Sequence, residues 1–68
     1  MSKHLYRGIF NWYGEVYTLF RYAASKAQAF RLFLLELVNR LGYSLHRLKL
    51  YYNRHQSNYS IQEVTNVH

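Results

Sequence analysis

The side chains in this sequence best suited to chemistry are arginines, lysines and tyrosines that alternate along short segments. Arg47, Lys49 and Tyr51 occupy every second position within residues 45–52. If this segment is a strand, the three side chains share one side of a sheet, because strand side chains alternate. Arginine offers a planar fork for phosphate and tyrosine a flat ring for base stacking, so such a surface suits single-stranded or irregular nucleic acid.

Other segments extend this predicted anion-binding surface. A second strand directs residues 17, 19 and 21 outward if Val16, Phe20 and Tyr22 form its core side. The first strand and the segment after residue 52 each add an arginine. The predicted nucleic-acid or anion-binding residues are Arg7, Tyr17, Arg21, Arg47, Lys49, Tyr51 and Arg54.

The net charge indicates the class of partner. Nine Lys and Arg against three acidic residues give +6, which concentrates polyanions around a small domain. Nucleic acid or a nucleoprotein complex is the expected partner. The alternative is that the charge maintains solubility while the tyrosines cover apolar surface. A membrane surface is a weaker candidate, because strand-like segments favour a globular fold over one amphipathic helix.

Groups for catalysis and metal binding are sparse. The chain has no Asp, and its three Glu, at 15, 36 and 63, fall in three different predicted elements. The four histidines have no metal-ligand spacing, and there is no cysteine to join them. The three glycines form no glycine-rich phosphate loop. We therefore expect no enzyme activity, no metal, no cofactor and no small-molecule substrate.

A hairpin and a helix are predicted in the first part of the chain. Residues 4–11 and 15–22 alternate in hydrophobicity on either side of Trp12-Tyr13-Gly14, which is typical of two strands and a turn. Ser25 and Gln28, three residues apart, have the residue types and spacing of a capping box and predict the start of a helix. Gly42 predicts its end. Between them, apolar residues recur at helical spacing and predict one core-facing side.

The rest of the chain predicts one or two more strands. Residues 45–52 alternate again, with Leu48 and Leu50 expected beneath the helix. Residues 53–68 are polar apart from 59–64, which form either an edge strand or part of a tail. The expected fold is α+β, with a small antiparallel sheet of three or four strands, one helix on one face, and the order β-β-α-β(-β). Residues 1–52 are the single domain, and 53–68 the tail or edge strand.

A second predicted surface lies on the helix, outside its core side. Leu32 and Leu35 fall there with Asn39 nearby, so this patch is predicted to bind a partner. The partner is either a protein target or a second copy in a homodimer. Single exposed leucines are common, however, and the tail could cover these two instead.

The N-terminal residues predict a compartment. Met-Ser-Lys-His leads directly into an alternating segment, without the apolar run and cleavage site of a secretory signal. The most apolar window, residues 32–38, is far shorter than the ~20 residues that span a bilayer. The expected location is the cytoplasm, and the lack of cysteine fits a reducing compartment.

The predicted hairpin and the following Ala23-Ala24-Ser25-Lys26-Ala27-Gln28-Ala29-Phe30 resemble short proteins of phages and mobile elements, including some anti-CRISPR proteins. The resemblance covers about half the chain. It implies a stoichiometric inhibitor that blocks a host nucleoprotein machine by occupying a nucleic-acid-binding or partner-binding surface. The positive charge differs from the acidic, DNA-mimicking members of that group. Two hypotheses therefore remain, a nucleic-acid-binding module and a protein-binding inhibitor.

Overall fold

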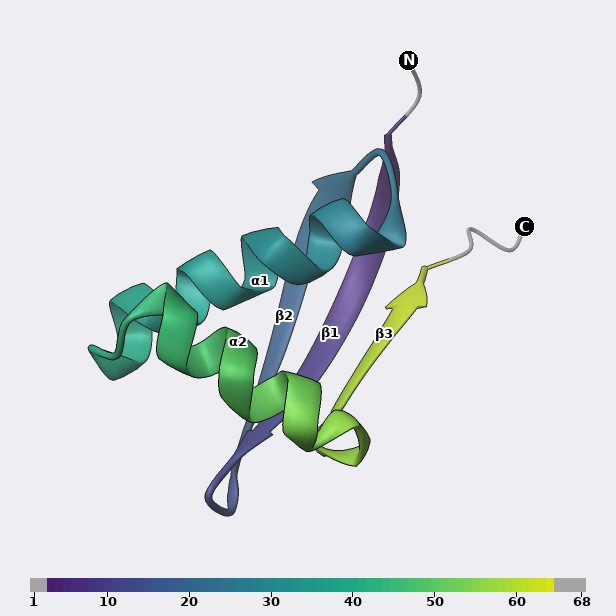
Figure 1. Cartoon of the computed structure of the whole chain (residues 1–68). Helices are drawn as coiled ribbons and strands as arrows, with labels where there is room; N and C mark the ends of the chain where they lie inside the picture. The colour runs from purple at the N-terminus through teal and green to yellow at the C-terminus, as the bar shows by residue number, and fades with distance from the viewer. Residues whose placement is uncertain (1–2, 65–68) are drawn as a thin grey trace.

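The order of the elements is β-β-α-α-β in the computed structural model, which describes residues 3–64 (Figure 1). Strands β1 (His4–Trp12) and β2 (Glu15–Ala23) form a hairpin, and helices α1 (Lys26–Leu41) and α2 (Leu45–Arg54) follow. A short 3-10 helix, η1 (Gln56–Asn58), leads into strand β3 (Tyr59–Glu63). The expected α+β class is confirmed, whereas the predicted order is wrong because a second helix replaces the third predicted strand.

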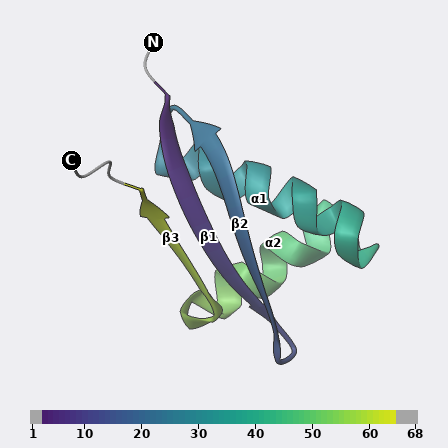
Figure 2. The ribbon, with the colours of Figure 1, turned by 180° about the vertical axis from the view of Figure 1, so that it is seen from behind.

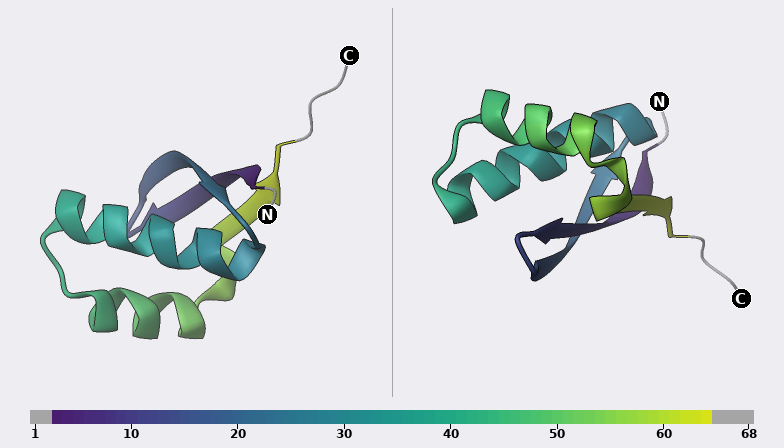
Figure 3. Two further views of the ribbon diagram at one scale, coloured as in Figure 1. Left: turned by 90° about the horizontal axis from the view of Figure 1, so that it is seen from above. Right: turned by 60° about the horizontal axis from the view of Figure 1, so that its bottom comes forward.

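The sheet has the order β2-β1-β3, and β1 is antiparallel to both of its neighbours. Both helices lie on one side of this sheet, next to each other and running in opposite directions (Figure 3). Seen from behind, the strands lie in front and no helix covers them (Figure 2). The fold therefore has a helix-covered side and an open side.

The turn between β1 and β2 determines which side each residue of the hairpin occupies. Tyr13 and Gly14 both have positive φ, 50° and 92°, as a two-residue type I′ hairpin turn requires. The amide of Gly14 donates to Oδ1 of Asn11 at 3.0 Å. Trp12 is consequently paired with Glu15, and every later pair follows from that register.

Helix α1 begins and ends where its caps predict. The Ser25 hydroxyl accepts from the amide of Gln28 at 3.2 Å, and Oε1 of Gln28 accepts from the amide of Ala24. At the other end, Gly42 adopts a left-handed conformation and its N–H donates to the carbonyl of Val38 at 2.9 Å. The predicted helix, with its start at Ser25 and its stop at Gly42, is confirmed.

Residues 45–52 form most of helix α2, so the strand predicted there is wrong. Leu48 and Tyr52 are fully buried one turn apart, while Leu50 is 45% exposed instead of lying in the core. The Ser44 hydroxyl caps the helix by accepting from the amide of Arg47 at 3.2 Å. Apolar residues three and four positions apart favour a helix here, and the Ser44 cap adds to this preference. In the helix, Leu48 and Tyr52 both reach one core.

The core lies between the helices and the covered side of the sheet, and a close approach at Gly8 shapes it. A Cβ atom at Gly8 would lie 2.7 Å from ring carbons of both Phe10 and Phe33, so only glycine fits there without displacement. The hydroxyl of buried Tyr52 donates to the carbonyl of Asn11 at 3.1 Å. Burial raises the pKa of Tyr52 to about 12.

The two sides of β2 are the reverse of those predicted. Leu19 is only 2% exposed beneath the helices, whereas Val16, Phe20 and Tyr22 are 60%, 51% and 65% exposed on the open side. The physical reason is the register, which pairs Leu19 with Gly8. Because Phe33 packs on Gly8, Leu19 shares the covered side with it.

Strand β3 completes the sheet. Tyr59–Glu63 pairs with β1, and the amide of Val64 extends the pairing by donating to the carbonyl of Leu5 at 2.7 Å. Residues 53–68 were predicted to form a tail or an edge strand. Part of this segment is an edge strand, and positions 65–68 lie outside the described residues. Within residues 3–64, no helix has the length and apolarity needed to cross a membrane.

Candidate nucleic-acid interface

The predicted Arg/Lys/Tyr sheet face does not exist as one surface. Tyr17 and Arg21 point to the helix-covered side, where both have acidic neighbours. Nη2 of Arg21 lies 2.7 Å from Oε1 of Glu36. The Tyr17 hydroxyl donates to the carboxylate of Glu15 at 2.8 Å, and this hydrogen bond raises the pKa of Tyr17. These two residues are therefore not available on the open side.

Arg7 does lie on the open side of the sheet, as expected. Its Nη2 donates to Oε1 of Gln62 on β3 at 2.9 Å, and Phe20 is its pairing partner on β2. The other predicted cations lie on the helix-covered side of the sheet, Arg21 on β2 and the rest on α2, so Arg7 does not share a surface with them.

Helix α2 brings three of the predicted residues together on one flank. Arg47, Tyr51 and Arg54 are spaced i, i+4 and i+7, which places them along one stripe of a helix. Lys49 is about 200° around the helix from Arg47 and lies on the opposite flank. The structure thus unites Arg47, Tyr51 and Arg54, and separates Lys49 from them.

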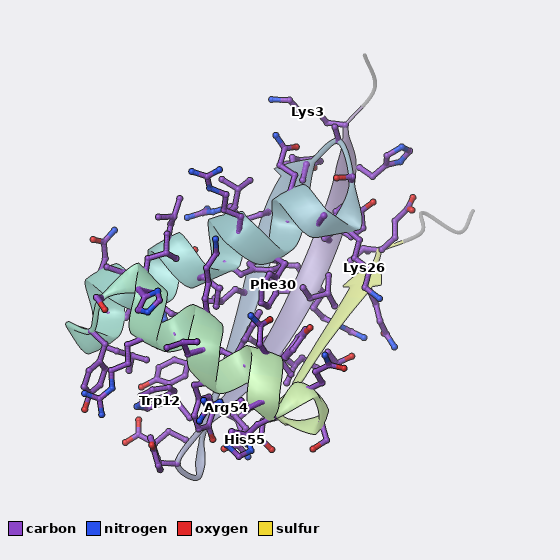
Figure 4. All side chains as sticks on the ribbon, in the orientation of Figure 1. Lys3, Trp12, Lys26, Phe30, Arg54 and His55 are labelled. Atoms are coloured by element: carbon purple, nitrogen blue, oxygen red, sulfur yellow. The ribbon has the colours of Figure 1, made fainter. Side chains whose placement is uncertain are left out.

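This flank of α2 contacts the tip of the β1–β2 hairpin through aromatic rings. The Tyr51 ring centre lies 4.7 Å from that of Trp12 and 5.4 Å from that of Tyr13. The centre of the His55 ring lies 4.7 Å from that of the Tyr51 ring. Trp12, Arg54 and His55 all project at the hairpin end of the molecule (Figure 4). Buried Trp12 therefore supports a set of more exposed rings.

Three further contacts order this region. The Arg47 guanidinium carbon lies 4.6 Å from the centre of the Tyr43 ring, and the Tyr43 ring packs 5.2 Å from that of Trp12. Nδ2 of Asn58 donates to the Tyr51 hydroxyl at 2.8 Å. We call the resulting set of side chains the α2–hairpin surface; it comprises Tyr13, Tyr43, Arg47, Tyr51, Arg54 and His55.

The predicted binding residues do not include three members of this surface, namely Tyr13, Tyr43 and His55. Tyr13 was visible only as part of the turn, although a ring at a hairpin tip must lie near solvent. The N-cap Ser44 was the signal that could have revealed the others. It predicts a helix from residue 45 onward, which places Tyr43 at the start of α2 and His55 at its end.

Helix α2 contributes Arg47 and Arg54 to the α2–hairpin surface and contains no acidic residue. Glu36 binds Arg21 and Arg40 at 2.7 and 2.9 Å, and Glu63 contacts His4 at 3.1 Å. The third carboxylate, Glu15, accepts from Tyr17. Among the described residues, Arg47 and Arg54 consequently have no ion-pair partner.

The chemistry available at this surface is recognition of anions and flat rings. Two guanidinium groups can bind phosphate oxygens, and the exposed ring of Tyr13 offers a face for stacking. In the part of the chain that the structure describes, no three His, Cys, Asp or Glu side chains are grouped to hold a metal ion.

The predicted partner-binding patch on α1 is only partly accessible. Leu35 is 40% exposed, and Asn39, one turn further on, is also exposed. Leu32 is instead partly buried against the core, so its predicted outward position is wrong. The reason is that α1 has neighbours on two sides, the sheet and α2, which widens its buried arc beyond that of a helix covering a sheet alone.

Comparison with known proteins does not assign the chain to a family. No family model, curated protein or solved structure matches it. What the chain binds is therefore inferred from its own side chains.

Proposed function

We propose that this chain is a small, non-enzymatic module that binds single-stranded nucleic acid through the α2–hairpin surface. One observation supports the proposal above all others. Arg47 and Arg54 lie on the same flank of a helix that has no carboxylate, with tyrosine rings beside them.

Phosphate binding is the first part of the proposed interaction. Arg47 and Arg54 are two helical turns apart, about 10 Å along the axis, so they engage different phosphates of one strand. Neither guanidinium has to leave an ion pair within the described residues before it binds. The net charge of +6 adds long-range attraction for a polyanion.

Base stacking is the second part. Tyr13 is 71% exposed at the hairpin tip, and its ring packs 4.8 Å from that of buried Trp12, which holds it in place. Stacking of a base on such a ring contributes about 1–3 kcal/mol. Exposed rings favour a single strand, because the bases of a duplex are stacked on each other and cannot reach them.

The proposal is tested by fluorescence anisotropy with a labelled single strand of about 20 nucleotides and with the corresponding duplex. We expect the single strand to bind more tightly, and the affinity to fall steeply between about 50 and 200 mM salt. The double variant Arg47→Gln/Arg54→Gln removes two phosphate contacts. It should reduce the slope of log affinity against log salt by about 1.4, since each contact to a single strand contributes about 0.7.

The matched control is Lys26→Gln/Arg31→Gln, which removes the same charge from exposed positions on α1. It should weaken binding less, because it changes only the long-range attraction. Equal losses in the two double variants would contradict the α2–hairpin surface. Weak binding that does not respond to salt would contradict nucleic-acid binding altogether.

A second candidate function is the stoichiometric inhibition of a nucleoprotein machine through protein contact, as the resemblance to phage proteins implies. Exposed Leu35 and Asn39, one turn apart on the outer side of α1, favour it. Affinity capture from host lysate, with and without nuclease, separates the candidates. A nuclease-resistant partner that Leu35→Lys loses and Arg47→Gln/Arg54→Gln keeps would support inhibition over nucleic-acid binding.

A further inference from the structure

A shallow hollow lies beside the end of β1, next to the 3-10 helix η1. Its volume is about 180 Å³, below the ~300–1,000 Å³ of pockets for drug-sized ligands, which leaves room for one flat ring system. The hollow is lined by Ile9, Asn11, Val16 and residues 57–60. These residues combine apolar side chains with amides and hydroxyls, and such a lining suits a flat ring with polar edges.

Hydrogen bonds within the protein determine what the two asparagines of the hollow offer a ligand. Oδ1 of Asn11 already accepts from the amide of Gly14 at 3.0 Å, so its Nδ2 remains as a donor. Nδ2 of Asn58 already donates to the Tyr51 hydroxyl at 2.8 Å, so its Oδ1 remains as an acceptor. One donor and one acceptor in the same hollow match the Watson–Crick edge of an unpaired base, where an acceptor and a donor are neighbours.

The rest of the lining favours a base over a phosphate group. Ile9 and Val16 are 36% and 60% exposed, and a base that packs on them removes apolar surface from water. None of the residues that line the hollow carries a charge. A neutral ring therefore fits this lining, whereas a phosphate group would find no cation in it.

The hollow adjoins the α2–hairpin surface, because Asn58 lines the hollow and is hydrogen-bonded to Tyr51 of that surface. We propose that the hollow binds one unpaired base of the single strand by its Watson–Crick edge, with Asn11 donating and Asn58 accepting. This base site rests on the proposed function and adds base recognition to it, since phosphate contacts alone carry no sequence information.

NMR titration of the isotope-labelled protein with uridine and with 3-methyluridine tests the base site. Uridine has no phosphate, so its binding does not depend on Arg47 or Arg54. We expect millimolar uridine to shift the side-chain amide signals of Asn11 and Asn58. The methyl group of 3-methyluridine blocks its Watson–Crick edge, so this nucleoside should bind about two- to tenfold more weakly through the loss of a hydrogen bond. Signals that do not move, or equal binding of the two nucleosides, would overturn the proposal.

Two variants test the lining of the hollow, with circular dichroism as the check on folding. Asn11→Asp still accepts from Gly14 but no longer offers a donor, so it should lose most of the uridine binding. The control Thr18→Asp adds the same charge at an exposed position on the same side of the sheet and should bind uridine like the wild type. Val16→Trp fills the hollow from its rim and should also lose the binding. Uridine binding that persists in Asn11→Asp and in Val16→Trp would place the nucleoside elsewhere and refute the base site.

The base site and the proposed function can fail separately. A single strand that binds with a steep salt dependence, while uridine leaves the signals of Asn11 and Asn58 unchanged, would refute the base site and keep the phosphate contacts. Binding of uridine at the hollow without binding of a single strand would refute the proposed function and keep the hollow as a site for a base.

Discussion

The guanidinium of Arg47 lies over the ring of Tyr43, 4.6 Å from its centre, where the connection between α1 and α2 meets the α2–hairpin surface. A cation–π contact of this kind contributes about 0.5–1 kcal/mol at an exposed site. The contact matters mainly because it orients Arg47. It restricts this long side chain to one region before a ligand binds.

Replacing Tyr43 tests this orientation. Tyr43→Ala should raise the Kd for a single strand about three- to tenfold, because Arg47 loses the ring that orders it and one stacking surface disappears. Tyr43→Phe keeps the ring and should bind like the wild type. Fluorescence anisotropy at one salt concentration measures both, and a phenylalanine variant as weak as the alanine variant would refute a role for the ring.

Gly8 should not tolerate a side chain. Gly8→Ala places a methyl group 2.7 Å from ring carbons of Phe10 and Phe33, so we expect a loss of about 1–3 kcal/mol in the free energy of unfolding by urea. Adding Phe33→Leu creates room at the same place. The double variant should therefore lose less than the sum of the single losses, and strict additivity would show that Gly8 and Phe33 do not compete for space.

Ser44 should stabilise α2 through its cap. Ser44→Ala removes the oxygen that accepts from the amide of Arg47, and it should lower the free energy of unfolding by about 1 kcal/mol. Ser57→Ala, at an exposed position in η1 without a side-chain cap, serves as the control and should change little. If the two alanine variants unfold at the same urea concentration, the cap is not important.

The protein should lose stability at alkaline pH through Tyr52. Burial raises the pKa of this phenol from 10 to about 12 in the folded state, so its contribution is complete below pH 10 and declines as pH rises toward 12. The maximum loss from this group is about 3 kcal/mol.

Urea unfolding at pH 9 to 12 measures the effect of Tyr52, with the variants Tyr52→Phe and Tyr13→Phe for comparison. Tyr52→Phe should be less stable at neutral pH, because the hydrogen bond to Asn11 is lost, but its stability should fall less across this range. Tyr13→Phe, at an exposed ring, should follow the wild type. An equally steep decline in Tyr52→Phe would contradict the assignment.

The parts of the fold that depend on local signals were predictable from the sequence. Ser25, Gln28 and Gly42 define α1 through contacts within a few residues, and the turn at Gly14 defines the hairpin. Residues 45–52 carry apolar side chains that suit both a strand and a helix, and burial of Leu48 and Tyr52 in one core decides between them. That burial depends on distant residues, which periodicity alone does not contain.

The candidate site was partly predictable, although the predicted strand is not what brings its residues together. Arg47, Tyr51 and Arg54 were grouped by strand alternation and by nearness in sequence, yet they share a surface because of helical spacing. Alternation also separated β2 into two sides without showing which one the helices cover. Gly8 held that information, since a residue without a side chain on one side of a strand indicates that another element approaches closely there.

The central position of β1 has a consequence for the order of folding. On one edge β1 pairs with β2, which follows it directly in the sequence. On the other edge it pairs with β3, about fifty positions later, as Arg7 and Gln62 illustrate. During synthesis, the hairpin and α1 can form early, but one edge of β1 stays unpaired until Glu63 has left the ribosome. Completion of the sheet therefore waits for its last strand, and a nascent chain that stalls before Tyr59 exposes a strand edge open to aggregation.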